Sequence, residues 1–291
     1  MRTFAMAAAL LLMAATGACG KDRAMASAEA AKADVQKLVD LTATDVGEVE
    51  HGLPEGAKKL DVLLAKEIGK EDPKANAPAV RSALLKMRQQ VPELGIAKST
   101  FFAFTDPNGV AIRNDFEQDT MAGKDLLARW PGLVPAARTG AFASTVSTAA
   151  DGAADKADKD WVAAVPVKKA DGTTEGLLIT GWTYRRFAYH LQVTLQREVQ
   201  EGLMRRSGGK MPILYVCLFD RENVYGANAP RAIPVPPVNE KALAEVGLWA
   251  KTEAGIAASP LKITDRDFGW AATRLPKLGA DVGVVVLRSE L

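Results

Sequence analysis

Hydrophobic residues recur at helical spacing through the first part of the chain. Apolar positions at steps of three and four predict one amphipathic helix over about 30–49 and another over about 60–68. The sequence HGLP at 51–54 is expected to break the helix between them, because glycine and proline are unfavourable in a helix interior. We therefore predict a tether followed by helices over 19–98.

From residue 99 onward, short apolar runs alternate with turn sequences, a pattern typical of strands. Apolar residues at steps of four predict one long helix over 186–206, and a shorter helix is expected over 240–251. The predicted strands cover 99–104, 110–113, 141–148, 161–168, 176–184, 213–219, 224–225, 261–263, 268–274 and 281–287.

An internal repeat indicates two similar units. Residues 158–182 align without gaps with residues 265–289, and both begin Asp-basic-Asp-aromatic and continue as strand, glycine-containing turn and apolar strand. The runs FFAFTDPNGVAI and VCLFDRENVYGA match upstream in the same order. The predicted fold is α+β, with an N-terminal helical segment and two units, each an antiparallel sheet with flanking helices. We place the units at 99–185 and 211–291, linked by a helix over 186–210.

The N-terminus has the pattern of a secretory signal peptide. Arg2 precedes an apolar run of 12 residues, which is well short of the roughly 20 that a membrane-spanning helix needs. The run ends in Thr-Gly-Ala before Cys19, which resembles a bacterial lipoprotein processing site. We predict removal of residues 1–18, acylation of Cys19 and anchoring in the cell envelope. Since no Asp follows Cys19, the pattern resembles that of outer-membrane lipoproteins facing the periplasm or cell surface. An ordinary secretory signal is the alternative.

The composition excludes several classes of protein. The 291-residue chain has 37 Lys and Arg against 35 Asp and Glu, and this balance argues against a nucleic-acid binder. Two Cys exclude a disulfide-dense scaffold and a four-cysteine zinc site, and two His argue against a histidine-rich metal site. No nucleophile, phosphate-loop or metalloprotease motif is present. We therefore expect no enzyme activity, metal or cofactor.

Three short motifs resemble the Cache family of extracytoplasmic, PAS-like sensor domains. They are Asp-Pro-Asn-Gly at 106–109, Gly-Lys-Asp-Leu at 123–126, and the turn from Asp171-Gly172 to Gly176. With the repeat, the resemblance extends over about 30–291 as a tandem arrangement; GAF domains, which have a related sheet, are the alternative. It implies that small polar molecules bind between the sheet and its overlying loops. Many Cache proteins continue into a transmembrane helix and an output domain, whereas this sequence ends at Leu291, so we expect signalling through a partner.

Candidate ligand-binding residues gather near the predicted edges of the first sheet. A guanidinium could bind a carboxylate, a carboxylate an ammonium, and an aromatic ring could add cation–π attraction, which together suit an amino-acid-like or carboxylate ligand. The alternative is that the aromatic residues belong to the core and the charged ones are solvated. The candidates are Arg113, Asp115, Trp130, Asp158, Asp160, Trp161 and Tyr184.

Two functions remain open at this point. The first is a lipid-anchored, extracytoplasmic protein that senses a small molecule. The second is a structural or adaptor lipoprotein of the envelope that binds a protein partner and no small ligand. They differ in one physical feature, because a binding unit should keep a cavity with convergent polar groups, whereas an adaptor should fill that space with side chains.

Overall fold

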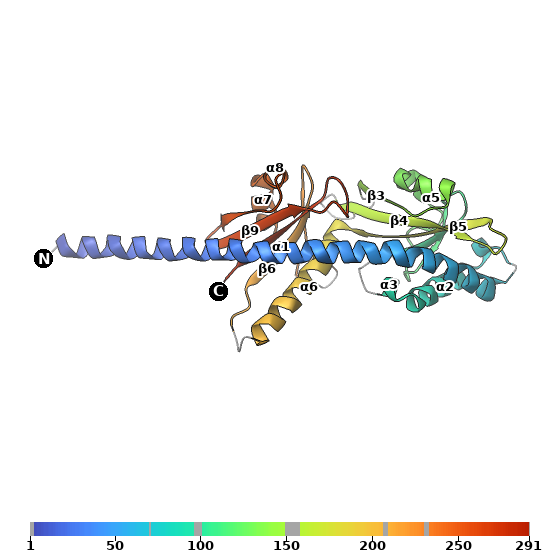
Figure 1. Ribbon diagram of the computed structural model, residues 1–291, viewed down its shortest axis with the longest axis horizontal. Coiled ribbons are helices and arrows are strands. Elements are labelled where there is room, and N and C mark those ends of the chain that lie inside the picture. Colours follow the sequence, from blue (N-terminus) through green and yellow to red (C-terminus); the bar gives the residue numbers. More distant parts are fainter. Residues whose placement is uncertain are drawn as a thin grey trace. The chain divides into compact units, whose positions relative to one another are not determined.

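The N-terminal part of the chain is one long helix, α1 (Thr3–Ile68). The computed structural model describes residues 3–69, 71–95, 101–148, 158–205, 209–229 and 233–290, with side chains from residue 22 onward (Figure 1). The predicted lipidation site Cys19 and the side chains of the predicted signal peptide lie outside this description. Buried residues follow α1 at steps of three and four, and include Val35, Leu38, Val46, Val49, Leu53, Ala57, Leu60, Leu64 and Ile68.

The predicted break at 51–54 is wrong, because α1 continues through Pro54. The two glycines near it serve close packing. A Cβ atom on Gly52 would lie 2.8 Å from Cβ of Glu93, and one on Gly56 would lie 2.8 Å from Cδ1 of Leu94. These glycines let the helix approach α3 (Pro92–Gly95), and the uninterrupted apolar stripe offsets the backbone hydrogen bond that Pro54 cannot donate.

The chain divides into two compact units. The first-sheet unit comprises residues 43–187, and the second-sheet unit comprises residues 1–42 and 188–291. The division falls inside α1 and near the start of α6 (Tyr184–Arg205), so each unit contains a segment of both helices in addition to its own sheet.

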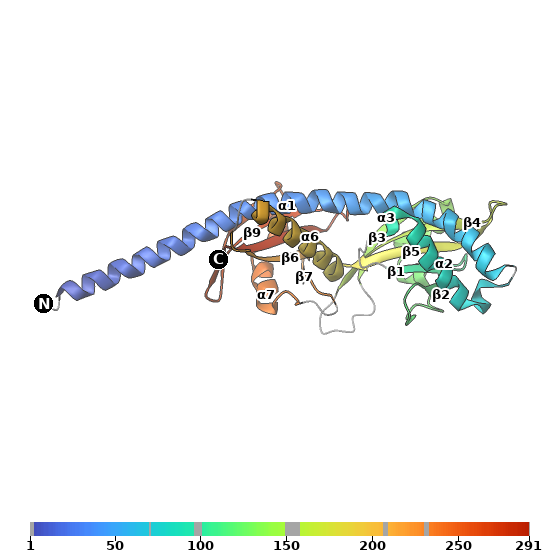
Figure 2. The same ribbon diagram turned by 90° about the horizontal axis from the view of Figure 1, so that it is seen from below.

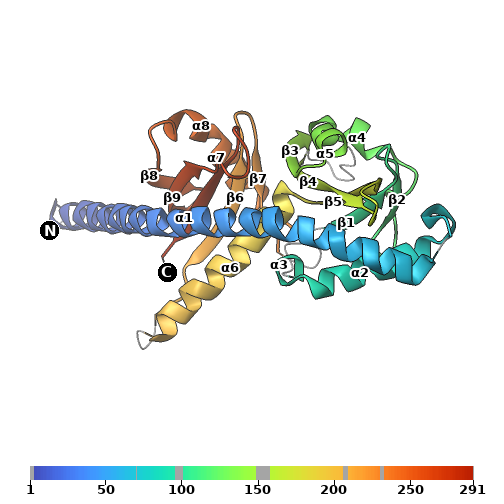
Figure 3. The same ribbon diagram turned by 45° about the vertical axis from the view of Figure 1, so that its right-hand side comes forward.

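The first-sheet unit has five antiparallel strands in the order β2-β1-β5-β4-β3. Figure 3 shows α1, α2 and α3 on one face of this sheet and α4 and α5 on the other. The strands are β1 (Phe101–Thr105), β2 (Ala111–Asn114), β3 (Ala143–Thr148), β4 (Lys159–Lys168) and β5 (Thr174–Thr183). The remaining helices are η1 (Pro73–Ala75), α2 (Ala77–Gln90), α4 (Leu126–Arg129), η2 (Pro131–Leu133) and α5 (Val134–Thr139).

The second-sheet unit repeats this topology, with the order β7-β6-β10-β9-β8. Figure 2 shows α1 and α6 on one face of this sheet and α7 on the other. The elements are β6 (Ile213–Phe219), β7 (Val224–Gly226), α7 (Pro237–Glu245), α8 (Leu248–Lys251), β8 (Ala257–Ile263), β9 (Arg266–Arg274) and β10 (Gly283–Ser289). The predicted α+β fold, with an N-terminal helix and two antiparallel sheets linked by a long helix, is confirmed.

The gap-free repeat predicts correctly which residues pair between neighbouring strands, but it predicts wrongly which face of the sheet their side chains occupy. Ala164 pairs with Ile179, and the residues 107 positions later, Ala271 and Val286, also pair. However, Val162 packs beneath α4 and η2, whereas its aligned residue in the second sheet, Gly269, lies against the backbone of α1. Successive residues of a strand point to opposite faces, so the alignment is one residue out for side-chain direction.

Candidate functional site

Arg129 is the last residue of α4, and hydrogen bonds between this helix and the first hairpin turn fix where it lies. Asp125 caps this helix, since its Oδ1 accepts a 2.9 Å hydrogen bond from the backbone N–H of Ala128. The backbone N–H of Leu126 donates to the carbonyl of Gly109 in the β1–β2 turn at 2.9 Å. The Gly-Lys-Asp-Leu segment therefore fastens α4 to the hairpin and fixes where Arg129 lies.

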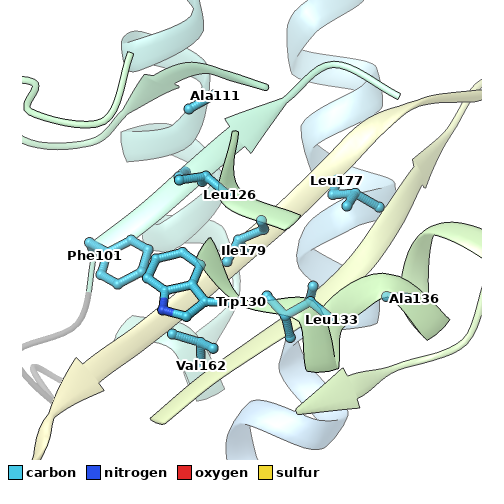
Figure 4. Close-up of a cluster of buried hydrophobic side chains, with 11 residues drawn as sticks. Phe101, Ala111, Leu126, Trp130, Leu133, Ala136, Val162, Leu177 and Ile179 are labelled. Carbon is cyan, nitrogen blue, oxygen red and sulfur yellow. The ribbon is translucent and has the colours of Figure 1, made fainter. Parts of the chain in front are cut away.

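Trp130 follows directly and is fully buried on the face of the sheet that α4 and η2 cover (Figure 4). Its ring stacks on Phe101 of β1, with the ring centroids 5.8 Å apart. The guanidinium carbon of Arg129 lies 4.8 Å from the centre of the indole, a cation–π distance. Leu133 and Val162 pack in the same cluster, so this part of the face is apolar and filled.

Asp160 of β4 lies at the polar border of that cluster, on the same face as Val162. Only 5% of the residue is exposed, and its Oδ2 is 3.5 Å from Nη2 of Arg129. Burial raises the pKa of the Asp160 carboxyl; Arg129 opposes this shift, and the negative charge of Asp158 adds to it. A buried carboxylate with a raised pKa is under-compensated by its neighbours, and an additional positive charge would stabilise its ionised form.

Asp158 stands just before β4 and is half-buried. Its Oδ1 accepts hydrogen bonds from the backbone N–H groups of Lys159 at 2.9 Å and Arg185 at 3.4 Å. Burial raises the pKa of Asp158 as well, although a hydrogen bond with the Thr183 side chain and the charge of Arg185 oppose the shift. The end of β5 and the start of α6 thus hold this second carboxylate close enough to Asp160 for its negative charge to disfavour ionisation of Asp160.

The resulting cluster combines two carboxylates, two guanidiniums and an aromatic ring at one end of the sheet. Carboxylates with raised pKa values are suited to accept hydrogen bonds from an ammonium group, which supplies the missing positive charge. Arg129 presents planar donors that match a carboxylate group. The arrangement can therefore recognise a small molecule that carries an amino group, alone or together with a carboxylate.

Three of the predicted site residues, Trp130, Asp158 and Asp160, are brought together in this cluster. Trp161 belongs to the opposite face, where it stacks on Trp182 with the ring centroids 4.2 Å apart. Tyr184 is fully buried at the first position of α6. Both serve the core of the unit.

The structure does not bring Arg113 and Asp115 together with Asp160, because two strands separate β2 from β4, and ligand binding by these two residues stays a prediction. Arg113 pairs with Asp119 at 3.0 Å and donates to two backbone carbonyls of the following loop. Asp115 pairs with Arg88 of α2 at 3.2 Å and accepts a 2.9 Å hydrogen bond from the backbone N–H of Phe102. They fix the β2 loop and the packing of α2.

Sequence reasoning missed Arg129 and Arg185. Each is adjacent to a predicted site residue, Trp130 and Tyr184 respectively. The available signal was the basic residue next to each aromatic one. These basic residues belong to the site only because the ends of α4 and β5 meet at the start of β4. The pattern along the chain does not show that these ends meet.

Within the ranges that the structure describes, no group of His, Cys, Asp and Glu side chains could hold a metal ion. In the same ranges, no helix has the combined length and apolar character needed to cross a bilayer.

The fold is similar to several solved structures of receptor domains. They include the sensor domain of the Vibrio cholerae histidine kinase DctB (14% identity, TM-score 0.49, 92% of this chain and 98% of that one). The periplasmic domain of Vibrio cholerae LuxQ (11%, 0.47, 90% and 98%) is also similar. So is the ligand-binding domain of the Pseudomonas aeruginosa amino acid chemoreceptor PctC in complex with GABA (15%, 0.42, 87% and 97%).

At identities of 11 to 15% the similarity concerns the fold alone. Comparison of the sequence with known protein families and with curated proteins finds no match.

Proposed function

We propose that the protein is an extracytoplasmic sensory protein that binds a small amino compound at Asp158 and Asp160. The observation that carries this proposal is the pair of carboxylates at one end of the first sheet, both with pKa values raised by burial. Burial is the main cause of both shifts, and a bound cation beside the two carboxylates would stabilise their ionised forms.

An amino-acid-like ligand has groups complementary to Asp158, Asp160 and Arg129. Its ammonium group would sit between the two carboxylates, and its carboxylate would pair with Arg129. The rim of Trp130 borders the same place, because Arg129 stacks on that ring while it contacts Asp160.

The proposal is tested by thermal unfolding of the full chain with amino acids, simple amines and matched carboxylic acids. A ligand at about 100 times its Kd stabilises the protein by about 2.7 kcal/mol, a readily visible shift in Tm. We expect amines and amino acids to raise the Tm, and short carboxylic acids that have neither an amino group nor an apolar body, such as acetate, to have no effect.

Asp160→Asn should abolish the shift, while Glu117→Gln should preserve it. Glu117 is an exposed residue of the same unit, so the control makes the same charge change away from the cluster. A Tm shift that survives Asp160→Asn, or a panel without any shift, would contradict the proposal.

The proposal also places the protein on a membrane through an acylated Cys19. The support is the apolar run and the small residues that precede this cysteine in the sequence. Several acyl chains on one residue give stable anchoring, since each buried CH2 contributes about 0.8 kcal/mol. In cells, wild-type protein should incorporate labelled palmitate and sediment with membranes, and Cys19→Ser should do neither. Membrane association of the Cys19→Ser protein would refute the anchor.

The adaptor alternative is favoured by one observation, the filling of the sheet face by Trp130, Leu126 and Leu133. In that function the protein would bind an envelope protein and no small ligand. Cross-linking in the envelope, followed by identification of the captured protein, distinguishes it from the sensory function when the ligand panel gives no shift.

A further inference from the structure

A cavity lies in the second-sheet unit, and none of the residues that line it belongs to the carboxylate pair. Its volume is about 240 Å³, and it is bounded by the β6–β7 turn and by the junction of α7 and α8. The floor consists of buried apolar residues, Phe219, Leu243 and Leu248. The cavity volume is somewhat smaller than the roughly 300–1,000 Å³ of pockets for drug-sized molecules, so the cavity suits a smaller ligand.

The corresponding place in the first-sheet unit is filled. There the β1–β2 turn packs against α4, and a Cβ atom on Gly109 would overlap the side chain of Leu127. A bridge between Val110 and Asp125 closes the turn further. Because the two units share one topology, the opening in the second is a property of its own residues and not of the fold.

Trp249 forms one wall of the cavity and is held there by a guanidinium. The Cζ atom of Arg274 lies 4.2 Å from the centre of the indole, and Nη2 of Arg274 donates to the carbonyl of Trp249 at 3.2 Å. Trp249 is the one tryptophan of the five that is not buried. A partly exposed indole over an apolar floor offers a flat surface to an apolar or aromatic group.

Arg221 stands at the rim, with its Cζ atom 5.2 Å from the centre of the same ring. Its Nε and Nη2 donate to one carboxylate oxygen of Asp281, at 3.0 and 2.8 Å. The two side chains are 66% and 54% exposed, and an ion pair this open to water contributes little stability. A ligand carboxylate can therefore replace Asp281 as the partner of Arg221.

We propose that this cavity binds a small organic carboxylate with an apolar body. The carboxylate pairs with Arg221, and the apolar body lies between Trp249 and the leucine floor. A cationic ligand is disfavoured, because two guanidiniums already contact the indole and would repel it. Glu222, an exposed residue of the rim, opposes an anion and keeps the affinity moderate.

The test is quenching of tryptophan fluorescence in the full chain by 3-phenylpropionate. The matched probes are 3-phenylpropylamine and 3-phenylpropanamide, which keep the apolar body and change only the charge. We expect saturable quenching by the acid, lost in Trp249→Phe, and weaker or no quenching by the amine and the amide. Equal binding of the three compounds, or quenching without saturation, would overturn the proposal.

Variants distinguish the contribution of charge to binding from the contribution of cavity shape. Arg221→Gln should weaken binding of the acid at least about tenfold, and Glu222→Gln should strengthen it a few-fold. Ala244→Leu fills the cavity without a change of charge and should abolish binding, while Arg266→Gln, an exposed arginine of the same sheet, should have no effect. Circular dichroism establishes that each variant is folded, and unchanged affinity in Arg221→Gln would refute the assignment. Asp160→Asn should leave this binding intact, so failure here is independent of the site on the first sheet.

Discussion

Arg288 of β10 and Asp34 of α1 form a buried ion pair in which Nη1 lies 2.6 Å from Oδ2. Asp34 is only 3% exposed, and Arg288 also donates Nε to Glu290 at 2.7 Å. The backbone N–H of Glu290 in turn donates to Oγ of Ser27 at 3.2 Å. The last strand of the second sheet is thereby fastened to the N-terminal helix within the same unit.

Loss of the Asp34 carboxylate should destabilise the second-sheet unit strongly. Asp34→Asn leaves the partly buried Arg288 guanidinium with Glu290 as its remaining charged partner, and breaking a buried pair in this way costs about 3 kcal/mol. The free energy of unfolding, measured by urea denaturation, should fall accordingly. Lys37→Gln is the control, because Lys37 pairs with Glu198 at 3.8 Å with both side chains about half exposed.

That exposed pair should contribute only about 0–1 kcal/mol. The double variant Asp34→Asn with Arg288→Met should recover part of the loss, since no buried charge remains. Equal effects of Asp34→Asn and Lys37→Gln would show that the buried pair is not the fastening contact.

The carboxylate pair should make stability depend on pH in a definite direction. The folded-state pKa values of Asp158 and Asp160 are raised above the reference value of 3.8, so the folded protein binds these protons more tightly than the unfolded chain. The stabilisation that comes from this tighter proton binding at Asp158 and Asp160 is present in full below pH 3.8. It is lost as pH rises through the raised pKa values. Asp160→Asn should reduce this loss.

The measurement is the difference in unfolding free energy between wild type and Asp160→Asn across the acidic range. A difference is needed because Asp106 has the opposite sign: burial disfavours its ionisation, but hydrogen bonds from Lys74 and from the backbone outweigh this and lower its pKa. Its stabilisation is lost as pH falls. A difference independent of pH would contradict the shifted pKa of Asp160. Binding of an amino ligand should strengthen as pH rises through the same range, because the ligand requires ionised carboxylates.

The fold could be predicted from sequence where periodicity was strong. The strands and the long helix α6 appear in the predicted order, because alternation and steps of four report burial directly. The break at 51–54 could not be predicted correctly, since Gly52 and Gly56 match α3, an element that is distant in the sequence. A glycine needed for close packing looks the same in sequence as one that ends a helix.

The site could be predicted only in part, for a related reason. Residue type makes Asp158, Asp160 and Trp130 candidates, but which of them share a face depends on strand register. Arg113 was expected beside them, yet it turns toward Asp119 in its own loop. Arg129 contacts Asp160 across 31 positions of sequence, and no local pattern encodes that distance.

Glycine at position 269 should be essential to the contact between α1 and the second sheet. A Cβ atom there would overlap the backbone of Ala28, which cannot move away as a flexible side chain could. Gly269→Ala should destabilise the protein by about 1–3 kcal/mol, as overpacking does. Gly202→Ala provides the contrast: nothing lies within 4 Å of its added Cβ, and a helical alanine should stabilise by about 0.5–1 kcal/mol. Thermal unfolding of both variants checks the prediction, which a stable Gly269→Ala protein would exclude.

Arg113 and Arg129 should separate stability from binding. Arg113→Gln removes the pairing with Asp119 and two bonds to backbone carbonyls, and should lower the free energy of unfolding by about 1–3 kcal/mol while the affinity for an amino acid stays unchanged. Arg129→Gln removes the guanidinium beside Asp160 and should weaken amino acid binding about tenfold, because the ligand carboxylate loses a charged partner. A simple amine, which has no carboxylate, should bind Arg129→Gln at least as tightly as wild type, since one competing cation is gone. Calorimetric titration with an amino acid and its decarboxylated amine measures both effects. If only Arg113→Gln lost affinity for the amino acid, the binding site would lie at the β2 loop and not at Arg129.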